Sequence, residues 1–378
     1  MAEFCSKEEV KEFVIQRLHL TPETLGKTRN DVLSIVSDIG GLQYGGHKIE
    51  LFNRFENFKP EWFDHWYENH AIIEGHVLRG ALRIVNADEY PFYFKATRTV
   101  SRKRRYQKCP VSLGSGHRKA LGFIEKHGPF SPSEFGILFV GKHPQLKGKG
   151  KSLLYDLYNY GKIVRVGRSR NKPLYHSLGR LPYRLDIEQT SEEEAKKWLF
   201  LKSLNTYGPF TLDDIAHWVG WTLTETKEIS EILLREDKIV NIAVEDERKP
   251  HYLRVEDLPF LRSLRNNLPH HSFIKILFND DAFLLGYYKR LRDFFGYDWR
   301  YPHFREGVVW RAAILCGRQL VGEAIVDMYA KDSFFNVRSL LLRKGFASRE
   351  ILCRTENEFG RHAVFQSKTL RMCKPRVV

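Results

Sequence analysis

Two short segments of the chain share one sequence pattern. Residues 127–134 read His-Gly-Pro-Phe-Ser-Pro-Ser-Glu, and residues 207–214 read Tyr-Gly-Pro-Phe-Thr-Leu-Asp-Asp. In each copy a Pro-Phe pair precedes a hydroxyl residue, Ser131 or Thr211, and an acidic residue stands three positions later. A hydroxyl and an acid with this spacing satisfy the free backbone N–H groups at a helix start reciprocally. We therefore predict two helices that begin directly after Ser131 and Thr211, 80 residues apart.

The similarity between the two copies continues beyond these helix starts. Residues 153–154, 161–164 and 172–175 match residues 233–234, 237–240 and 249–252. The pattern predicts a first helix at about 115–127 and 190–206, and a third helix at about 148–160 and 222–236. The order helix, capped helix, helix, strand, turn, strand is that of a winged helix, whose third helix can enter a major groove. We therefore predict winged helices at 99–185 and 186–262.

The two ends of the chain carry different patterns. Helical spacing at 7–19 and 30–39, and helices near 47–57 and 60–69, precede an extended stretch at 71–80, which predicts a degenerate first winged helix in 1–98. After Pro259, β-like runs occur at 272–277, 307–316, 320–328 and 363–367, with a turn at 316–319. They predict a small barrel-like domain at 263–378. The predicted fold class is α+β, with three tandem winged helices followed by a C-terminal β-barrel-like domain.

The balance of charge points to an anionic partner. Lys and Arg number 61 against 46 acidic residues, which gives a formal net charge of +15. Such an excess attracts polyphosphate or an anionic membrane. No apolar stretch approaches 18 residues and no secretory signal is present, so we expect a cytoplasmic protein that does not span a membrane. Duplex DNA is the expected partner, and a monomer the expected state.

Metal, disulfide and nucleotide sites are not expected. The five cysteines lie far apart in the chain without a Cys-x-x-Cys pair, which predicts free thiols. Residues 148–152, Gly-Lys-Gly-Lys-Ser, lack the earlier glycine that a phosphate-binding P-loop needs. The sequence therefore predicts no metal and no cofactor.

Three basic segments are candidates for contact with DNA phosphates. The hairpin at 165–172 is basic, whereas its counterpart at 244–249 is mixed in charge; the run at 97–108 is the densest positive segment; and the loop at 142–151 leads into a predicted helix start. Such clusters give affinity without reading sequence. Alternatives are that the winged helices bind protein and that residues 97–108 form a solvated linker. The predicted phosphate contacts are Arg79, Arg102, Lys103, Arg104, Arg105, Lys147, Lys149, Lys151, Arg165, Arg168, Arg170 and Lys172.

Two segments near the N-terminus carry a resemblance to a known family. Residues 38–45 read Asp-Ile-Gly-Gly-Leu-Gln-Tyr-Gly, and residues 76–88 read His-Val-Leu-Arg-Gly-Ala-Leu-Arg-Ile-Val-Asn-Ala-Asp. They resemble the opening of the bacterial winged-helix DNA glycosylases that unhook interstrand crosslinks. The resemblance implies three tandem winged helices in a C shape, a C-terminal β-barrel, and hydrolysis of the N-glycosidic bond of N7-alkylated or crosslinked purines.

The same resemblance names a catalytic motif, which this chain matches in part. The family carries a glutamine, an apolar or aromatic residue, then glutamine or aspartate. Gln43 and Tyr44 fit the first two positions and Gly45 does not fit the third. In the family's Leu-Arg-Gly-Thr-x-His stretch, Arg79 and Gly80 match, whereas Ala81 and Arg83 replace the threonine and the histidine.

Chemistry explains why the partial motif leaves two functions open. Cleavage passes through an oxocarbenium-like state that needs a positioned water, and a cationic alkylpurine is already a good leaving group. Gln43 could then orient the water, with His47, Glu50 or His70 compensating for Gly45. The alternatives are that Gln43 is a strand residue bonded to neighbouring backbone, and that the protein is a non-catalytic DNA-binding regulator or damage sensor.

Overall fold

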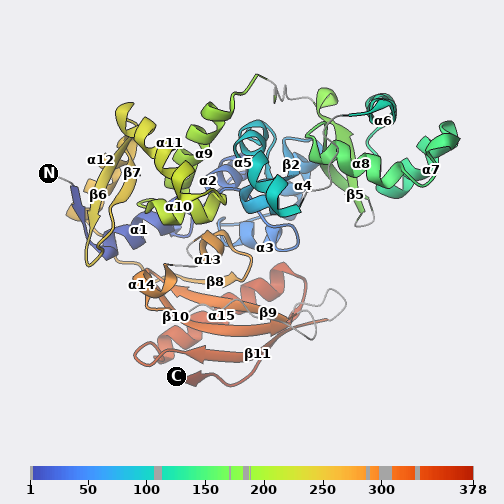
Figure 1. Ribbon diagram of the computed structural model, residues 1–378. Helices are drawn as coiled ribbons and strands as arrows, with labels where there is room; N and C mark the ends of the chain where they lie inside the picture. The colour runs from blue at the N-terminus through green and yellow to red at the C-terminus, as the bar shows by residue number, and fades with distance from the viewer. Residues whose placement is uncertain are drawn as a thin grey trace.

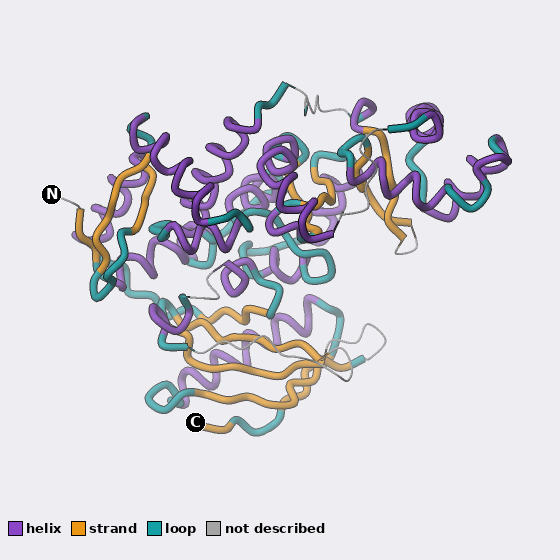
Figure 2. The backbone as a smooth tube through the Cα atoms, in the orientation of Figure 1, coloured by secondary structure: helices purple, strands orange, loops and turns teal. Residues whose placement is uncertain are grey.

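The computed structural model describes residues 3–105, 113–169, 172–181, 187, 189–286, 290–297, 309–327 and 333–377; of residues 99–105 and 309 it describes the backbone alone. A layer of helices lies over a C-terminal sheet (Figure 1). The two repeated units occupy opposite ends of the helical layer; most of the N-terminal elements lie between them, and the first strand lies at the end formed by the later unit. Among the described residues the strands form three sheets, which Figure 2 shows well separated from one another.

The two repeated units have the predicted order of elements. The middle unit contains α6 (Ser115–His127), α7 (Pro132–Lys142), η3 (Pro144–Leu146), α8 (Gly150–Asn159), β4 (Ile163–Ser169), β5 (Lys172–Ser177) and η4 (Leu178–Arg180). The later unit contains α9 (Glu192–Tyr207), α10 (Leu212–Val219), α11 (Leu223–Arg235), β6 (Ile239–Val244) and β7 (His251–Arg254). Both predicted capping boxes are confirmed, at Ser131 and at Thr211. The phenylalanine before each cap, Phe130 or Phe210, pairs with the second strand of its own hairpin.

The N-terminal elements connect the two units. They are β1 (Glu3–Cys5), α1 (Lys7–Arg17), η1 (Pro22–Thr24), α2 (Asp31–Asp38), α3 (His47–Phe52), α4 (Pro60–Glu68), β2 (Ile72–His76), η2 (Leu78–Gly80), β3 (Leu82–Asn86) and α5 (Tyr90–Arg105). Strand β1 runs parallel to β6 of the later unit. The hairpin β2–β3 joins β4 of the middle unit through the pair Glu74 and Arg165, which gives the sheet order β3-β2-β4-β5.

The described part of the basic run at 97–108 is helical and is not a solvated linker. Residues 97–105 form the end of helix α5, and residues 106–108 lie outside the described residues. The reason is that Tyr90, Tyr93, Phe94 and Thr97 recur at helical spacing and are buried, so the helix is anchored before the basic residues begin. Lysine and arginine are good helix formers and extend it.

The C-terminal part is an open sheet covered by a helix. After η5 (Val255–Asp257) and α12 (Leu258–Asn266), it contains β8 (Ile274–Phe278), α13 (Ala282–Gly286), α14 (Leu291–Phe295), β9 (Val309–Cys316), β10 (Gln319–Asp327), β11 (Phe334–Leu342), α15 (Arg349–Phe365), β12 (Thr369–Met372) and β13 (Arg376–Val377). The strand order is β12-β11-β10-β9-β8, with β13 on β11. Strands β8 and β12 lie at opposite edges, so the described strands form no closed barrel.

The predicted strand at 363–367 is wrong. Helix α15 runs through Phe365, and its buried residues Thr355, Phe359 and His362 recur at helical spacing. A short apolar run does not distinguish a strand from the buried face of a helix. The turn predicted at 316–319 does connect β9 and β10.

Burial ties the N-terminal elements more closely to the later unit than to the middle one. One hydrophobic cluster extends from Cys5 through α9 and α10 to Leu320, whereas the middle unit and the C-terminal sheet each have a cluster of their own. The four described cysteines, Cys5, Cys316, Cys353 and Cys373, are free thiols. No described helix combines the length and apolar composition that crossing a membrane requires.

Candidate active site

The loop that carries Gln43 is held against the β2–β3 hairpin. Gly40 and Gly41 have φ of 71° and 89°, and a Cβ at Gly41 would come within 2.8 Å of the Ile84 carbonyl oxygen, so only glycine fits there. Leu42 then exchanges two backbone hydrogen bonds of 2.8 Å with Ile84 in β3. The buried Arg83 donates a hydrogen bond of 3.1 Å to the Gly41 carbonyl. The backbone leading to Gln43 is therefore fixed on one side.

The Gln43 side chain is half-buried and forms no hydrogen bond with any residue that the structure describes. It does not bond the neighbouring described backbone, as the structural alternative for this residue required. Its amide donors and acceptor therefore have no partner among the described residues. Tyr44, the next residue, lines a pocket.

His47 lies beside the position where the expected third side chain of the motif is absent. Gly45 has φ of 110°, and a Cβ there would meet no described atom within 4 Å apart from its chain neighbours. The Gly45 N–H donates a long hydrogen bond of 3.4 Å to His47 Nδ1, and the His47 ring stacks on Tyr44 at 5.2 Å between centroids. Burial, with the charges of Lys48 and Arg168, lowers the pKa of His47 to about 3. The imidazole is neutral at physiological pH.

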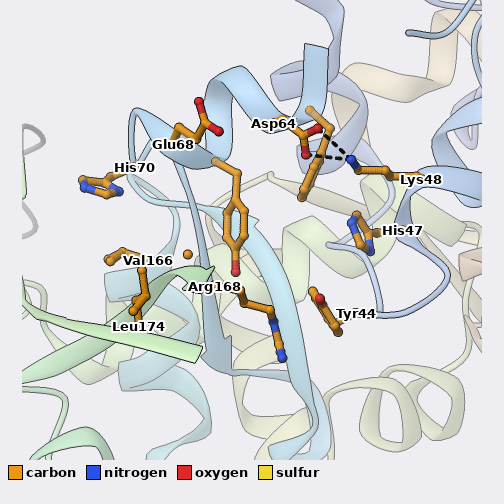
Figure 3. A pocket seen from close by; sticks show the side chains of 12 residues that line it. Tyr44, His47, Lys48, Asp64, Glu68, His70, Val166, Arg168 and Leu174 are labelled. Atoms are coloured by element: carbon orange, nitrogen blue, oxygen red, sulfur yellow. Dashed lines mark hydrogen bonds and ion pairs between the residues drawn. The ribbon is translucent and has the colours of Figure 1, made fainter. Parts of the chain in front are cut away.

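The pocket has a volume of about 430 Å³ and lies between helices α3 and α4 on one side and the β4–β5 hairpin on the other (Figure 3). Lys48 and Asp64 face each other across one edge, with Nζ 2.7 Å from the carboxylate. His70, at another edge, has φ of 60°. The residues that line the pocket are Tyr44, His47, Lys48, Phe63, Asp64, Tyr67, Glu68, His70, Val166, Gly167, Arg168 and Leu174.

A buried carboxylate, Glu74 in β2, organises one wall of this pocket. Arg168 donates from Nε and Nη2 to its two oxygens, each at 2.9 Å, and the hydroxyl of Tyr67 also donates to it. The Arg168 guanidinium lies 3.4 Å from the centre of the Tyr44 ring. Burial disfavours the charged form of Arg168 and so lowers its pKa, but the hydrogen bond and charge of Glu74 have the larger combined effect, and the pKa of Arg168 is raised. Arg168 therefore connects the middle unit to both β2 and the Gln43 loop.

The predicted phosphate contacts divide into groups. Lys147, Lys149 and Lys151 are exposed and form no ion pair with a described residue, whereas Lys172 is exposed and bonds Ser133 Oγ at 3.4 Å. Arg165 and Arg168 instead share Glu74, and Arg165 Nη1 lies 3.7 Å from it. Arg79 Nη1 lies 3.1 Å from His217 Nε2 in α10. Arg170 and the side chains of Arg102, Lys103, Arg104 and Arg105 lie outside the described residues.

The structure thus brings His47, His70 and Arg168 to one pocket, whose lining includes Tyr44 but not Gln43. Arg79 and the lysine loop lie outside that lining. Sequence reasoning missed Lys48, Asp64, Tyr67 and Glu74. One signal was available for Glu74, because it interrupts the apolar strand Ile72-Ile73-Glu74-Gly75, and a charge in such a strand requires a partner. The described residues contain no group of three or more His, Cys, Asp or Glu that could hold a metal.

The fold is shared with a solved structure. The chain matches the structure of Streptomyces sahachiroi DNA glycosylase AlkZ with a TM-score of 0.72 and 16% identity, over 98% of this chain and 100% of that chain. At this identity the likeness shows a shared α+β fold.

The particular family follows from the sequence. The family model described as DNA glycosylase AlkZ-like matches residues 36–356, so the chain belongs to the AlkZ-like DNA glycosylase family. No curated protein sequence matches it. Its substrate is DNA and its function is DNA repair of the glycosylase type.

Proposed function

We propose that this protein hydrolyses the N-glycosidic bond of N7-alkylated purines in duplex DNA, interstrand crosslinks included. The observation that carries the proposal is the setting of Gln43. Its amide has no partner among the described residues, and its backbone is fixed by the Leu42–Ile84 bridge on one side and by the Tyr44–Arg168 stack on the other. A catalytic amide needs this kind of support, because it must be oriented before the reaction begins.

In the proposed reaction the bond between C1′ and the alkylpurine nitrogen breaks, and its electron pair neutralises the cationic ring. Gln43 orients a water whose oxygen then bonds C1′ of the oxocarbenium-like sugar. His47, with its pKa near 3, is too weak a base to take the proton at neutral pH. It serves as a neutral hydrogen-bonding partner of that water in place of the missing third side chain, and the proton passes to solvent. His70 has the smaller role of bounding the pocket.

The basic segments supply the grip on DNA. We assign phosphate contacts first to Lys147, Lys149, Lys151 and Lys172, which are exposed, and also to Arg79, Arg170 and the run Arg102–Arg105. Arg165 and Arg168 are less suited to this role, because both already pair with Glu74. In this proposal the N-terminal, middle and later units act as three winged helices of a cytoplasmic monomer.

The test uses a duplex with a single N7-methylguanine and measures heat-labile abasic sites. We expect single-turnover cleavage by the wild type and a loss of about 100-fold in Gln43→Ala, the size seen when one preorganised polar group is removed. Asn205→Ala, an amide on α9 outside the pocket lining, is the control and should cleave normally.

A second function is favoured by one observation: the third position of the family's catalytic motif is Gly45, which has no side chain, and a Cβ there would meet no described atom within 4 Å apart from its chain neighbours. It is a non-catalytic damage sensor or regulator that binds DNA without cleaving it. An absence of abasic product at enzyme excess, with duplex binding retained, would support this second function and refute the first.

A further inference from the structure

Helix α7 of the middle unit carries apolar side chains on two sides. Phe135 and Phe139 are fully buried in the hydrophobic cluster of that unit. Ile137 and Leu138 point away from that cluster and are 74% and 51% exposed. A helix that is apolar all round is normally covered on every side, whereas a surface helix has a polar outer side. Helix α7 lies at the outer end of the helical layer (Figure 1), and the described residues leave this apolar side uncovered.

The later unit shows how the same side of the second helix is used when it is covered. At the offset of 80 residues, His217 and Trp218 of α10 occupy the positions of Ile137 and Leu138. Trp218 is 2% exposed and packs on Gly40 of the N-terminal elements, where an added Cβ would lie 2.7 Å from the tryptophan ring. The second helix of the repeated unit therefore has one side for its own core and another that can dock a separate element.

Cations without acidic partners lie beside the exposed apolar pair of α7. Lys142 stands four positions after Leu138, on the same side of the helix, and its Nζ lies 5.3 Å from the centre of the Phe123 ring in α6. Lys126 stands one turn after Phe123 in α6. Neither lysine forms an ion pair with a described residue, and Glu134, the acid of α7, is already bonded in the capping box. The exposed surface is thus apolar at its centre and positive at its edge.

We infer that the outer face of α7, formed by Ile137, Leu138 and Lys142 with Lys126 beside it, docks an acidic amphipathic segment of a partner protein. An apolar centre with a polar rim is the arrangement found at protein interfaces, and an acidic segment complements the charge of this rim. A second copy of this chain would place like charges opposite each other at a symmetric contact. Contacts to the DNA backbone are hydrogen bonds to phosphate and sugar, which Ile137 and Leu138 cannot form. None of these residues lines the pocket, so the docking does not depend on glycosylase activity.

The first arm of the test measures the apolar centre of this face. The probe is a fluorescein-labelled helical peptide of about 18 residues, with leucine at helical spacing and glutamate elsewhere. We expect Leu138→Ser to weaken its binding about tenfold in anisotropy titrations, because a central apolar anchor is lost. Leu223→Ser on α11 is the matched control, since Leu223 is also 51% exposed and also precedes a lysine, Lys227, by four positions. It should leave the affinity unchanged.

The second arm measures the charge of the rim. A second peptide has the same leucines and carries lysine in place of glutamate, and the wild type should bind the acidic peptide at least about tenfold more tightly. Lys126→Glu with Lys142→Glu should reverse this preference. Lys227→Glu with Lys238→Glu in the later unit changes the net charge equally and should leave the preference unchanged.

The controls decide between this partner and the other possible occupants. Equal losses in Leu138→Ser and Leu223→Ser, or no binding of the acidic peptide to the wild type, would overturn the inference. A loss of duplex affinity in Leu138→Ser with peptide affinity unchanged would assign the face to DNA. Self-association of the wild type that Leu138→Ser abolishes in sedimentation velocity would assign it to a second copy of the chain. Either of these two results would overturn the inference as well, and thermal unfolding should show that each variant is folded.

Discussion

The hairpins of the two repeated units arise from the same sequence pattern and have different surroundings. In the middle unit, Ile163 of β4 packs into the hydrophobic cluster of that unit, whereas Val164 and Val166 pack into the central cluster, the one that extends from Cys5 to Leu320. Arg168, near the end of the same strand, bonds Glu74 in β2. In the later unit, Ile239, Ile242 and Val244 of β6 all belong to the central cluster. The repeated sequence therefore determines the fold of each unit, and the elements packed against a unit determine which contacts its hairpin makes. In the middle unit the hairpin forms a wall of the pocket.

The largest effect expected from this difference concerns stability. Glu74→Ala leaves Arg168 and Arg165 without their buried partner, and we expect the free energy of unfolding to fall by about 3–5 kcal/mol in urea titrations. The matched change in the later unit is Asp213→Ala, which removes the exposed partner of Lys249. It should cost less than about 1 kcal/mol. Equal losses for the two variants would show that the two hairpins are held alike.

A second prediction concerns the salt dependence of DNA binding. Replacing Lys147, Lys149 and Lys151 by alanine should reduce the slope of log affinity against log salt by about 3 units, since each phosphate contact contributes about 0.9. The control replaces Lys227, Lys238 and Lys249 in the later unit, whose hairpin is mixed in charge, and should change the slope by less than about 1 unit. Both slopes follow from fluorescence anisotropy with a labelled duplex. Equal changes in slope would mean that both repeats contact phosphate.

The smallest expected effect is a pH dependence of stability. The pKa of His47 falls from 6.5 to about 3 on folding, chiefly through burial. Below about pH 6.5 the unfolded chain therefore binds a proton at His47, whereas the folded protein does not. The free energy of unfolding consequently falls as the pH drops below 6.5. When the pH is lowered from 7.5 to 5.5, the free energy of unfolding of His47→Gln should fall by about 1 kcal/mol less than that of the wild type.

His251 in the later hairpin provides the comparison, because burial lowers its pKa to about 4. His251→Gln should change the pH dependence of stability in the same direction. Only His47→Gln should also alter the rate of abasic-site formation at neutral pH. A similar loss of rate in both variants would indicate a structural role for His47.

Predictions that depended on local chemistry agree with the structure. The helix starts at Ser131 and Thr211 follow from contacts within four residues, and the helices α6 and α8 begin and end within two residues of their predicted limits. Predictions that required a choice between equally local patterns failed, as at 363–367, where an apolar run was the end of a helix. For residues 97–105 the sequence left a solvated linker as an alternative to a phosphate contact, and the buried residues that precede them anchor a helix instead.

By itself, the sequence determined the repeated units, the excess of positive charge and the glutamine loop, because capping, composition and a contiguous motif all act over short distances along the chain. Only the tertiary structure decided where the cations of the middle hairpin point. Arg168 and Glu74 are separated by 94 residues, and nothing in the sequence pairs them. A buried carboxylate must find a partner wherever the fold brings one near. That requirement places Arg168, a predicted phosphate contact, in the wall of a pocket.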